Sequence, residues 1–132
     1  MRPGDEIELK VTPDRYATVR YAGASGDFNP IHIDEEFARQ VGLPGRILHG
    51  LWTMAQVARA HTEAFGGAGG PASLRSLSVQ FRGMGVMEQE ITVRATVEEV
   101  GPEVVTVRSE ATQGGKRIVR NGRAEIRRPR VR

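Results

Sequence analysis

The chain has 132 residues, of which 39% are hydrophobic and 27% are charged, and its formal net charge is +3. This length predicts one domain over residues 1–132 with a single core. No apolar run approaches the roughly 18 residues that a membrane span requires, no signal-peptide core follows Met1, and the absence of cysteine excludes disulfides and thiolate chemistry. We therefore expect a soluble, globular and cytoplasmic protein without a membrane partner.

The first helix is predicted to begin at Thr12, a good N-cap residue that is followed by proline in the first turn. Tyr16, Val19 and Ala22 then have the spacing of one buried helix face. Gly23 is the predicted end of this helix.

The loop that follows places a carboxylate, an amide and an imidazole within six residues, at Asp27, Asn29 and His32. A carboxylate and an imidazole on one rigid loop can share a water molecule and move protons near neutral pH. A helix start at His49-Gly50 offers a backbone N–H to an oxygen that gains negative charge. Together these groups predict the addition of water to an activated double bond, or its removal. The alternative is structural, because the segment from Asp27 to Asn29 is also typical of an ordinary Asx turn.

A second, shorter helix is predicted to begin after Asp34, which we interpret as an N-cap and not as a catalytic acid. Phe37 and Val41 are expected on its buried face, and Gly42 is placed to end it.

The longest helix is predicted over residues 50–65. Its expected buried stripe follows the i, i+3, i+4, i+7 pattern and consists of Leu51, Met54, Ala55, Ala58, Thr62 and Phe65. His61 lies beside this stripe and is interpreted as a packed or a surface histidine. The glycine-rich segment 66–71 ends the helix, and we do not interpret it as a phosphate loop because it follows a helix and lacks Gly-Lys-Ser/Thr.

Four strands with alternating polar and apolar residues are predicted between residues 73 and 128, with turns at Gly101-Pro102 and Gly114-Gly115. In the last strand, the residues expected opposite Val119, Arg123 and Glu125 are Ile118, Ala124 and Ile126. An antiparallel meander with one apolar face needs a cover, and the helix 50–65 is the element long enough to provide it. The predicted fold class is α+β, with an antiparallel sheet wrapped around one long central helix.

Residues 116–132 are strongly basic, with eight cationic side chains against the single acid Glu125. These side chains are Lys116, Arg117, Arg120, Arg123, Arg127, Arg128, Arg130 and Arg132. A nucleic acid, a phosphate-rich substrate, an acidic carrier protein and a solvated strand face are each compatible with this charge. Aromatic residues make up only 5% of the chain, so stacking platforms are scarce and no nucleic-acid partner is expected.

At Ser25-Gly-Asp27-Phe-Asn29-Pro30-Ile-His32, and again at Phe37-Ala38 and His49-Gly50, the sequence resembles the MaoC-like dehydratases. That family includes (R)-specific enoyl-CoA hydratases and (3R)-hydroxyacyl-carrier-protein dehydratases. The resemblance covers nearly the whole chain and includes the order of its elements. It implies a single hot-dog fold in which two subunits join their sheets, with the active site at their interface beside the long helix.

The resemblance also implies roles for individual residues. By motif position, Asp27 and His32 resemble the catalytic dyad of the family, and Gly50 resembles the glycine whose N–H faces the thioester carbonyl. His49 is interpreted as structural, and no cofactor or metal site is expected. The substrate-binding candidates are Ser25, Asn29, Trp52 and Arg82, of which Asn29 would also support the loop and Trp52 would line either the core or a substrate tunnel. Relatives often carry two prolines after an aromatic-arginine segment, and residues 83–88 lack both.

The activity implied is that of a hydro-lyase that interconverts trans-2-enoyl and (R)-3-hydroxyacyl thioesters of CoA or of an acyl carrier protein. The expected partner is a second copy of the chain, or a second hot-dog subunit in a heterodimer of which this chain would be the catalytic half. One alternative is a hot-dog acyl-thioesterase, which would need a carboxylate on the long helix, where Glu63 is the single acid. Another is a non-catalytic acyl-binding subunit, which would predict a degraded dyad.

Overall fold

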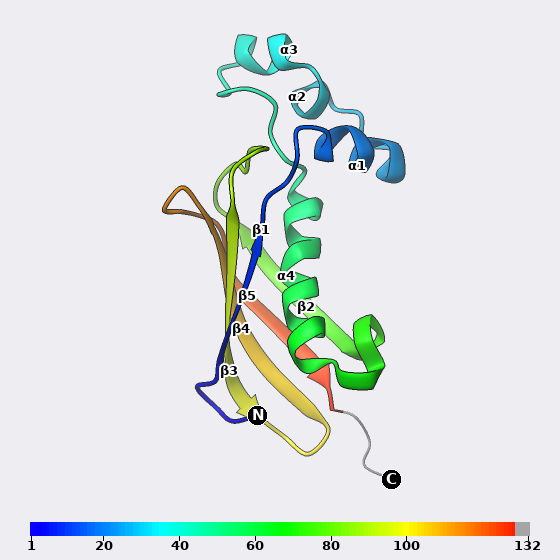
Figure 1. Ribbon diagram of the computed structural model, residues 1–132, viewed down its shortest axis with the longest axis vertical. Coiled ribbons are helices and arrows are strands. Elements are labelled where there is room, and N and C mark those ends of the chain that lie inside the picture. Colours follow the sequence, from blue (N-terminus) through cyan, green and yellow to red (C-terminus); the bar gives the residue numbers. More distant parts are fainter. Residues whose placement is uncertain (129–132) are drawn as a thin grey trace.

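The computed structural model describes residues 1–128 and shows a five-stranded antiparallel sheet with one long helix against one face (Figure 1). The strands are β1 (Glu6–Val11), β2 (Leu74–Phe81), β3 (Ile91–Val100), β4 (Val104–Gln113) and β5 (Lys116–Arg127). Their order across the sheet is β1-β3-β4-β5-β2, and every neighbouring pair is antiparallel. The predicted α+β architecture of a sheet around a long helix is confirmed.

The helices are α1 (Ala17–Ser25), α2 (Pro30–Ile33), α3 (Glu35–Gln40) and α4 (Gly50–Phe65), and the short 3-10 helix η1 (Gly67–Ser73) follows α4. The first three helices gather beyond the N-terminal end of α4, so they lie at one end of the sheet (Figure 1). Within residues 1–128 no helix has both the length and the apolar character that crossing a membrane requires.

The first predicted helix is displaced along the chain. It begins at Ala17 instead of Thr12, because the Asp14 carboxylate accepts a hydrogen bond from the Tyr16 N–H (2.9 Å) and forms an Asx turn ahead of the helix. The helix also runs past its predicted end, to a C-cap at Gly26 with a left-handed φ of 78°. This extension brings the end of α1 directly to the loop that carries the candidate dyad.

Two predicted buried faces are wrong in the single chain. Four large side chains on these predicted faces are at least 36% exposed. They are Tyr16 just before α1, Val19 within α1, Phe37 within α3 and Val41 just after α3. The prediction is confirmed at Ala22 alone, and the other buried residues of these helices are also small, namely Ala17, Thr18 and Ala38. The short helices therefore pack closely through small side chains and leave the large ones at the surface.

Helix α4 confirms the predicted helix over residues 50–65, but its buried face is rotated relative to the prediction. The buried residues are Thr53, Val57, Ala60, His61, Thr62 and Phe65. Of the expected buried stripe, only Thr62 and Phe65 are therefore confirmed as buried. Leu51 is 60% exposed, and Ala55 is exposed as well. The sheet packs against the side of α4 that carries small and polar residues. The more apolar side of the helix is not covered within a single chain.

The strand alternation is confirmed, because every second residue is buried as far as Val97 in β3 and throughout β4. The two glycine-containing turns join β3 to β4 and β4 to β5. Strand β5 departs from its predicted pattern, because Val119 is fully buried on the same side as Ala124. Its pairing with β4 gains one extra residue on β5 between Ala111–Val119 and Thr112–Arg117, and another where it jumps from Ser109–Gly122 to Ala111–Val119. Asn121, with a φ of 50°, forms this bulge, which reverses the alternation.

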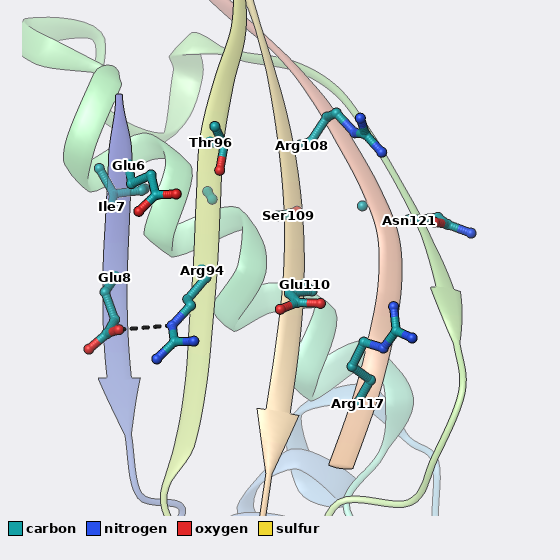
Figure 2. Close-up of a pocket in the computed structure, with 12 residues that line it drawn as sticks. Glu6, Ile7, Glu8, Arg94, Thr96, Arg108, Ser109, Glu110, Arg117 and Asn121 are labelled. Atoms are coloured by element: carbon teal, nitrogen blue, oxygen red, sulfur yellow. Dashed lines mark hydrogen bonds and ion pairs between the residues drawn. The ribbon is translucent and has the colours of Figure 1, made fainter. Parts of the chain in front are cut away.

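The outer face of the sheet, which points away from α4, carries a polar trough of about 670 Å³ (Figure 2). Side chains of four strands line it, including Glu8 and Arg94, whose carboxylate and guanidinium are 3.0 Å apart. Arg117 of the basic segment also lines the trough. Strand β5 contains the basic residues from Lys116 to Arg127, Arg128 follows it, and Arg130 and Arg132 lie outside the described residues.

Candidate active site

The loop between α1 and α2 is held by its own polar side chains. Ser25 Oγ accepts a hydrogen bond from the Asp27 N–H (3.1 Å) and donates one to the Tyr21 carbonyl (2.7 Å). The Asn29 N–H donates to Asp27 Oδ1 (3.2 Å), and Asn29 Oδ1 caps α2 by accepting from the Ile31 N–H (3.2 Å). Ser25 thus holds the Asp27 backbone, and the Asn29 N–H holds the Asp27 carboxylate, whereas the predicted contacts of Ser25 and Asn29 with substrate stay predictions.

His32 lies on α2, and its buried ring faces Asp27. Its Nδ1 is 2.8 Å from the Ile47 carbonyl oxygen, which can only accept, so Nδ1 carries a proton and donates it. Nε2 then faces Asp27 Oδ2 at 3.9 Å. This distance exceeds a direct hydrogen bond and suits two groups that contact one small molecule from opposite sides. The Asp27 side chain is 52% exposed, so the pair is open to a ligand.

The side chain of His49, which we interpreted as structural from the sequence, contacts this pair. Its ring stacks on that of His32, with centroids 3.9 Å apart and an interplanar angle of 23°. Its Nε2 is 3.0 Å from the Asp27 carbonyl oxygen. The residue is 2% exposed, so it lies beneath the open Asp27 carboxylate and contacts both members of the candidate dyad.

Asp27, His32 and His49 bring three potential ligand atoms within 4.8 Å of one another, a cluster that was not predicted. A zinc ion requires nitrogen lone pairs that converge at roughly 2.0–2.1 Å. The two imidazole rings stack with their planes nearly parallel, so their in-plane lone pairs do not converge on one point. The arrangement fits a proton-transfer site better than a metal site.

Gly50 is the first residue of α4, where a backbone N–H has no acceptor within the helix and lies at the positive end of the helix dipole. The Phe81 ring covers this position so closely that a Cβ on Gly50 would lie 3.2 Å from two ring carbons. Glycine therefore allows the aromatic ring and the helix N-terminus to come together. The free N–H is available to an oxygen that approaches beside Phe81.

Trp52 and Arg82 occupy different environments. Trp52 is partly buried and packs against the core cluster that contains Val57 and Ile91. The contact with the core is confirmed, and the alternative that Trp52 lines a substrate tunnel stays a prediction. Arg82 is exposed directly after Phe81, and its N–H donates to the Ile118 carbonyl (2.9 Å).

The loop after Phe81 is anchored without the two prolines. The side chain of Gln113 accepts a hydrogen bond from the Val86 N–H (2.8 Å) and donates to the carbonyls of Val86 (2.8 Å) and Gln89 (2.9 Å). The Gly85 carbonyl accepts from the Leu48 N–H (2.8 Å), just ahead of His49. One buried amide on β4 thus fixes the shape of the loop that the sequence left open.

Two further charged or titratable residues on α4 lie outside this site. Glu63, the acid that a thioesterase would need, is exposed and its Oε1 is 2.8 Å from Arg59 Nε. His61 is fully buried, and neither ring nitrogen has a hydrogen-bond partner within residues 1–128. Burial lowers the pKa of His61 to about 4. His61 is therefore a packed, uncharged histidine, as one of the two sequence interpretations had it.

The family model of the MaoC-like domain matches residues 1–121. The chain is 40% identical over 108 residues to the fatty acid synthase subunit beta of Aspergillus oryzae, which corresponds to 80% of this chain and 5% of that protein. It is 30% identical over 125 residues to the probable enoyl-CoA hydratase 2 of Dictyostelium discoideum, covering 95% of this chain and 41% of that protein. The chain thus spans well under half the length of these curated relatives.

Among solved structures, the R-hydratase PhaJ1 from Pseudomonas aeruginosa in its unliganded form is similar, with a TM-score of 0.87 and 24% identity. The alignment covers 99% of this chain and 84% of that one. This likeness confirms the predicted hot-dog fold. The chain belongs to the MaoC-like domain family, as the resemblance at residues 25–32 implied.

Proposed function

We propose that the chain is a hydro-lyase that interconverts trans-2-enoyl and (R)-3-hydroxyacyl thioesters. The observation that carries this proposal is the pairing of Asp27 Oδ2 with His32 Nε2 at 3.9 Å across an open side of the loop. The names of the R-hydratase and of the probable enoyl-CoA hydratase 2 among similar proteins support the same class of reaction. No cofactor is needed for this chemistry, because the thioester itself activates the double bond.

In the hydration direction, Asp27 would accept a proton from a water molecule as the water oxygen bonds to Cβ. The electron pair of the double bond then moves to the thioester oxygen, which the Gly50 N–H would hold at the positive end of α4. His32 orients the same water molecule through its unprotonated Nε2, takes up the proton that Asp27 has accepted and passes it to Cα, which restores both groups and closes the balance. Dehydration runs through the same groups in reverse.

We propose a second hot-dog subunit, most simply a second copy of this chain, as the partner. Four large apolar side chains around the candidate site are more than half exposed in the single chain, and these are Phe28, Leu51, Phe81 and Met84. Apolar exposure of this extent marks an interaction surface. The phosphopantetheine arm of the substrate would follow that interface, with Arg82 placed to meet its phosphate groups.

The thioesterase alternative is disfavoured by the ion pair between Glu63 and Arg59, which engages the single acid of α4 on an exposed surface. A non-catalytic acyl-binding subunit is disfavoured by the intact Asp27–His32 geometry.

The test follows the loss of enoyl-thioester absorbance on addition of crotonyl-CoA and of a longer 2-enoyl-CoA, with chiral analysis of the product. Asp27→Asn and His32→Ala are expected to lower kcat by about 10²–10⁴-fold. Glu36→Gln, which removes an exposed acid of α3, is the matched control and is expected to keep full activity. Release of free CoA, an (S)-product, or turnover that survives both substitutions would contradict the proposal.

A further inference from the structure

The residue at the start of α4 is an unusual choice for its position. N-caps are normally Ser, Thr, Asp or Asn, whose side chains bond the first free N–H groups of the helix. His49 occupies the N-cap of α4 with extended dihedral angles, and its side chain makes no capping hydrogen bond. The imidazole points back to the loop between α1 and α2. The usual preference for a capping side chain is therefore not met at a residue that contacts the candidate site. Such conflicts between local preference and structure are expected at functional sites.

The ring of His49 makes three contacts, and two of them are to the candidate dyad. Nε2 is 3.0 Å from the Asp27 carbonyl oxygen, and the ring stacks on His32 at 3.9 Å. Tyr21 closes the third side, with its ring centroid 4.7 Å away at an angle of 50°. One buried ring thus fixes the backbone of Asp27 and the plane of His32 together.

The hydrogen bonds assign opposite tautomers to the two neutral rings. A carbonyl oxygen only accepts, so His49 carries its proton on Nε2, whereas His32 carries its proton on Nδ1. The Nδ1 atom of His49 is buried and has no partner within residues 1–128. His32 consequently presents an unprotonated Nε2 to Asp27, while the lone pair of His49 is kept away from solvent.

We propose that His49 is the positioning residue of the proton-transfer pair: it sets the separation of Asp27 and His32 without contacting the substrate. This inference rests on the proposed function, because it names what holds that site in its working geometry. His49 connects the dyad loop to the N-terminal end of α4, so the same residue also relates the dyad to the free Gly50 N–H. A shift of about 1 Å in such an arrangement is sufficient to cost about 10²-fold in rate.

Three substitutions separate the contacts of His49. In His49→Gln the side-chain amide nitrogen reaches about as far as Nε2 and keeps the hydrogen bond to Asp27, whereas in His49→Asn it ends at the position of Nδ1 and does not reach. His49→Phe keeps the stacked ring and loses the donor. We expect kcat to fall by at least about tenfold in the Asn and Phe variants and clearly less in the Gln variant. KM should change by less than about threefold, because a ring that is 2% exposed does not touch substrate.

Imidazole nitrogen NMR provides a readout that does not depend on turnover. In spectra of the neutral rings at about pH 8, the wild type should show an Nε2-protonated His49 and an Nδ1-protonated His32, because each proton is donated to a carbonyl oxygen. The His32 ring signals should move in His49→Asn and stay near their wild-type positions in His49→Gln. Thermal unfolding of each variant is measured in parallel. If His49→Phe does not fold, the comparison of kcat and of the His32 signals between His49→Gln and His49→Asn decides the result.

An Nδ1-protonated His49, unchanged His32 signals in His49→Asn, or wild-type kcat in both the Asn and Phe variants would overturn the inference. A wild type without hydratase turnover would defeat the proposed function instead. In that case the NMR comparison of the Asn and Gln variants still decides whether His49 positions His32.

Discussion

His61→Leu should raise the stability of the protein and remove part of its sensitivity to acid. The His61 ring is fully buried on α4, and both of its nitrogens lack partners within residues 1–128. Leucine has a similar volume and no polar atoms, so it removes two desolvated groups without opening a large cavity. At about pH 8, the free energy of unfolding should therefore increase by about 1–2 kcal/mol.

The pH dependence follows from the pKa of His61, which burial lowers from 6.5 to about 4. Between these two values the unfolded chain binds more protons than the folded chain, so the free energy of unfolding falls as the pH falls through this window. The full shift corresponds to about 3 kcal/mol, and about 2 kcal/mol of it should be lost between pH 8 and pH 5. In His61→Leu this loss should disappear.

Urea unfolding at a fixed protein concentration, at pH 8 and at pH 5, measures both effects. Glu8 and Asp14 do not contribute within this window, because the pKa of Glu8 is lowered by its hydrogen bond to Arg94 and that of Asp14 by its hydrogen bond to Arg20. Their contribution is lost only as the pH falls below their ordinary values of 4.5 and 3.8. Equal losses of stability in wild type and His61→Leu between pH 8 and pH 5 would refute the reasoning.

Substitutions at Gly50, Asn121 and Gln113 test the candidate site and the contacts that support the fold around it. Gly50→Ala, which places a Cβ 3.2 Å from the Phe81 ring, should lower kcat/KM by about 10–100-fold, and Phe81→Leu should restore part of it in the double variant, as measured by the enoyl-CoA assay. Asn121→Val should cost about 1–2 kcal/mol because φ is 50° there, whereas Asn121→Gly should be nearly neutral in urea unfolding. Gln113→Leu leaves the Val86 N–H without its partner, so amide hydrogen exchange in residues 82–89 should accelerate more than amide hydrogen exchange in β3. An equal change in the two segments would contradict the anchoring role of Gln113.

The sequence was sufficient for the parts of the molecule that follow local rules. The alternation of β3 and β4 is regular because each strand has one buried face, and α4 begins at its predicted residue. These local rules were not sufficient at Asp14 and Asn121. A hydrogen bond to the Asp14 side chain delays the start of α1, and Asn121, at positive φ, reverses the alternation of side chains in β5. Neither effect changes the apolar pattern from which the elements were predicted.

The candidate site was partly visible in the sequence for a similar reason. Asp27 and His32 are close in sequence, so their pairing follows from one short loop. The place of His49 depends on how α4 docks against that loop, which no local pattern encodes. The rotated face of α4 has the same origin, because Leu51 points to a surface that one chain leaves uncovered.

The edge position of β1 determines when the site can form during synthesis of the chain. Glu6 on β1 pairs with Thr96 on β3, and the Pro13 carbonyl accepts a hydrogen bond from the Glu88 N–H (2.7 Å). At about 5–20 residues per second, a ribosome needs several seconds to travel from the first of these positions to the second. During that interval the segment with the candidate dyad is synthesised, but β3, the strand that pairs with β1, is not yet complete. The sheet that supports the candidate site is therefore completed only after β3 has been synthesised.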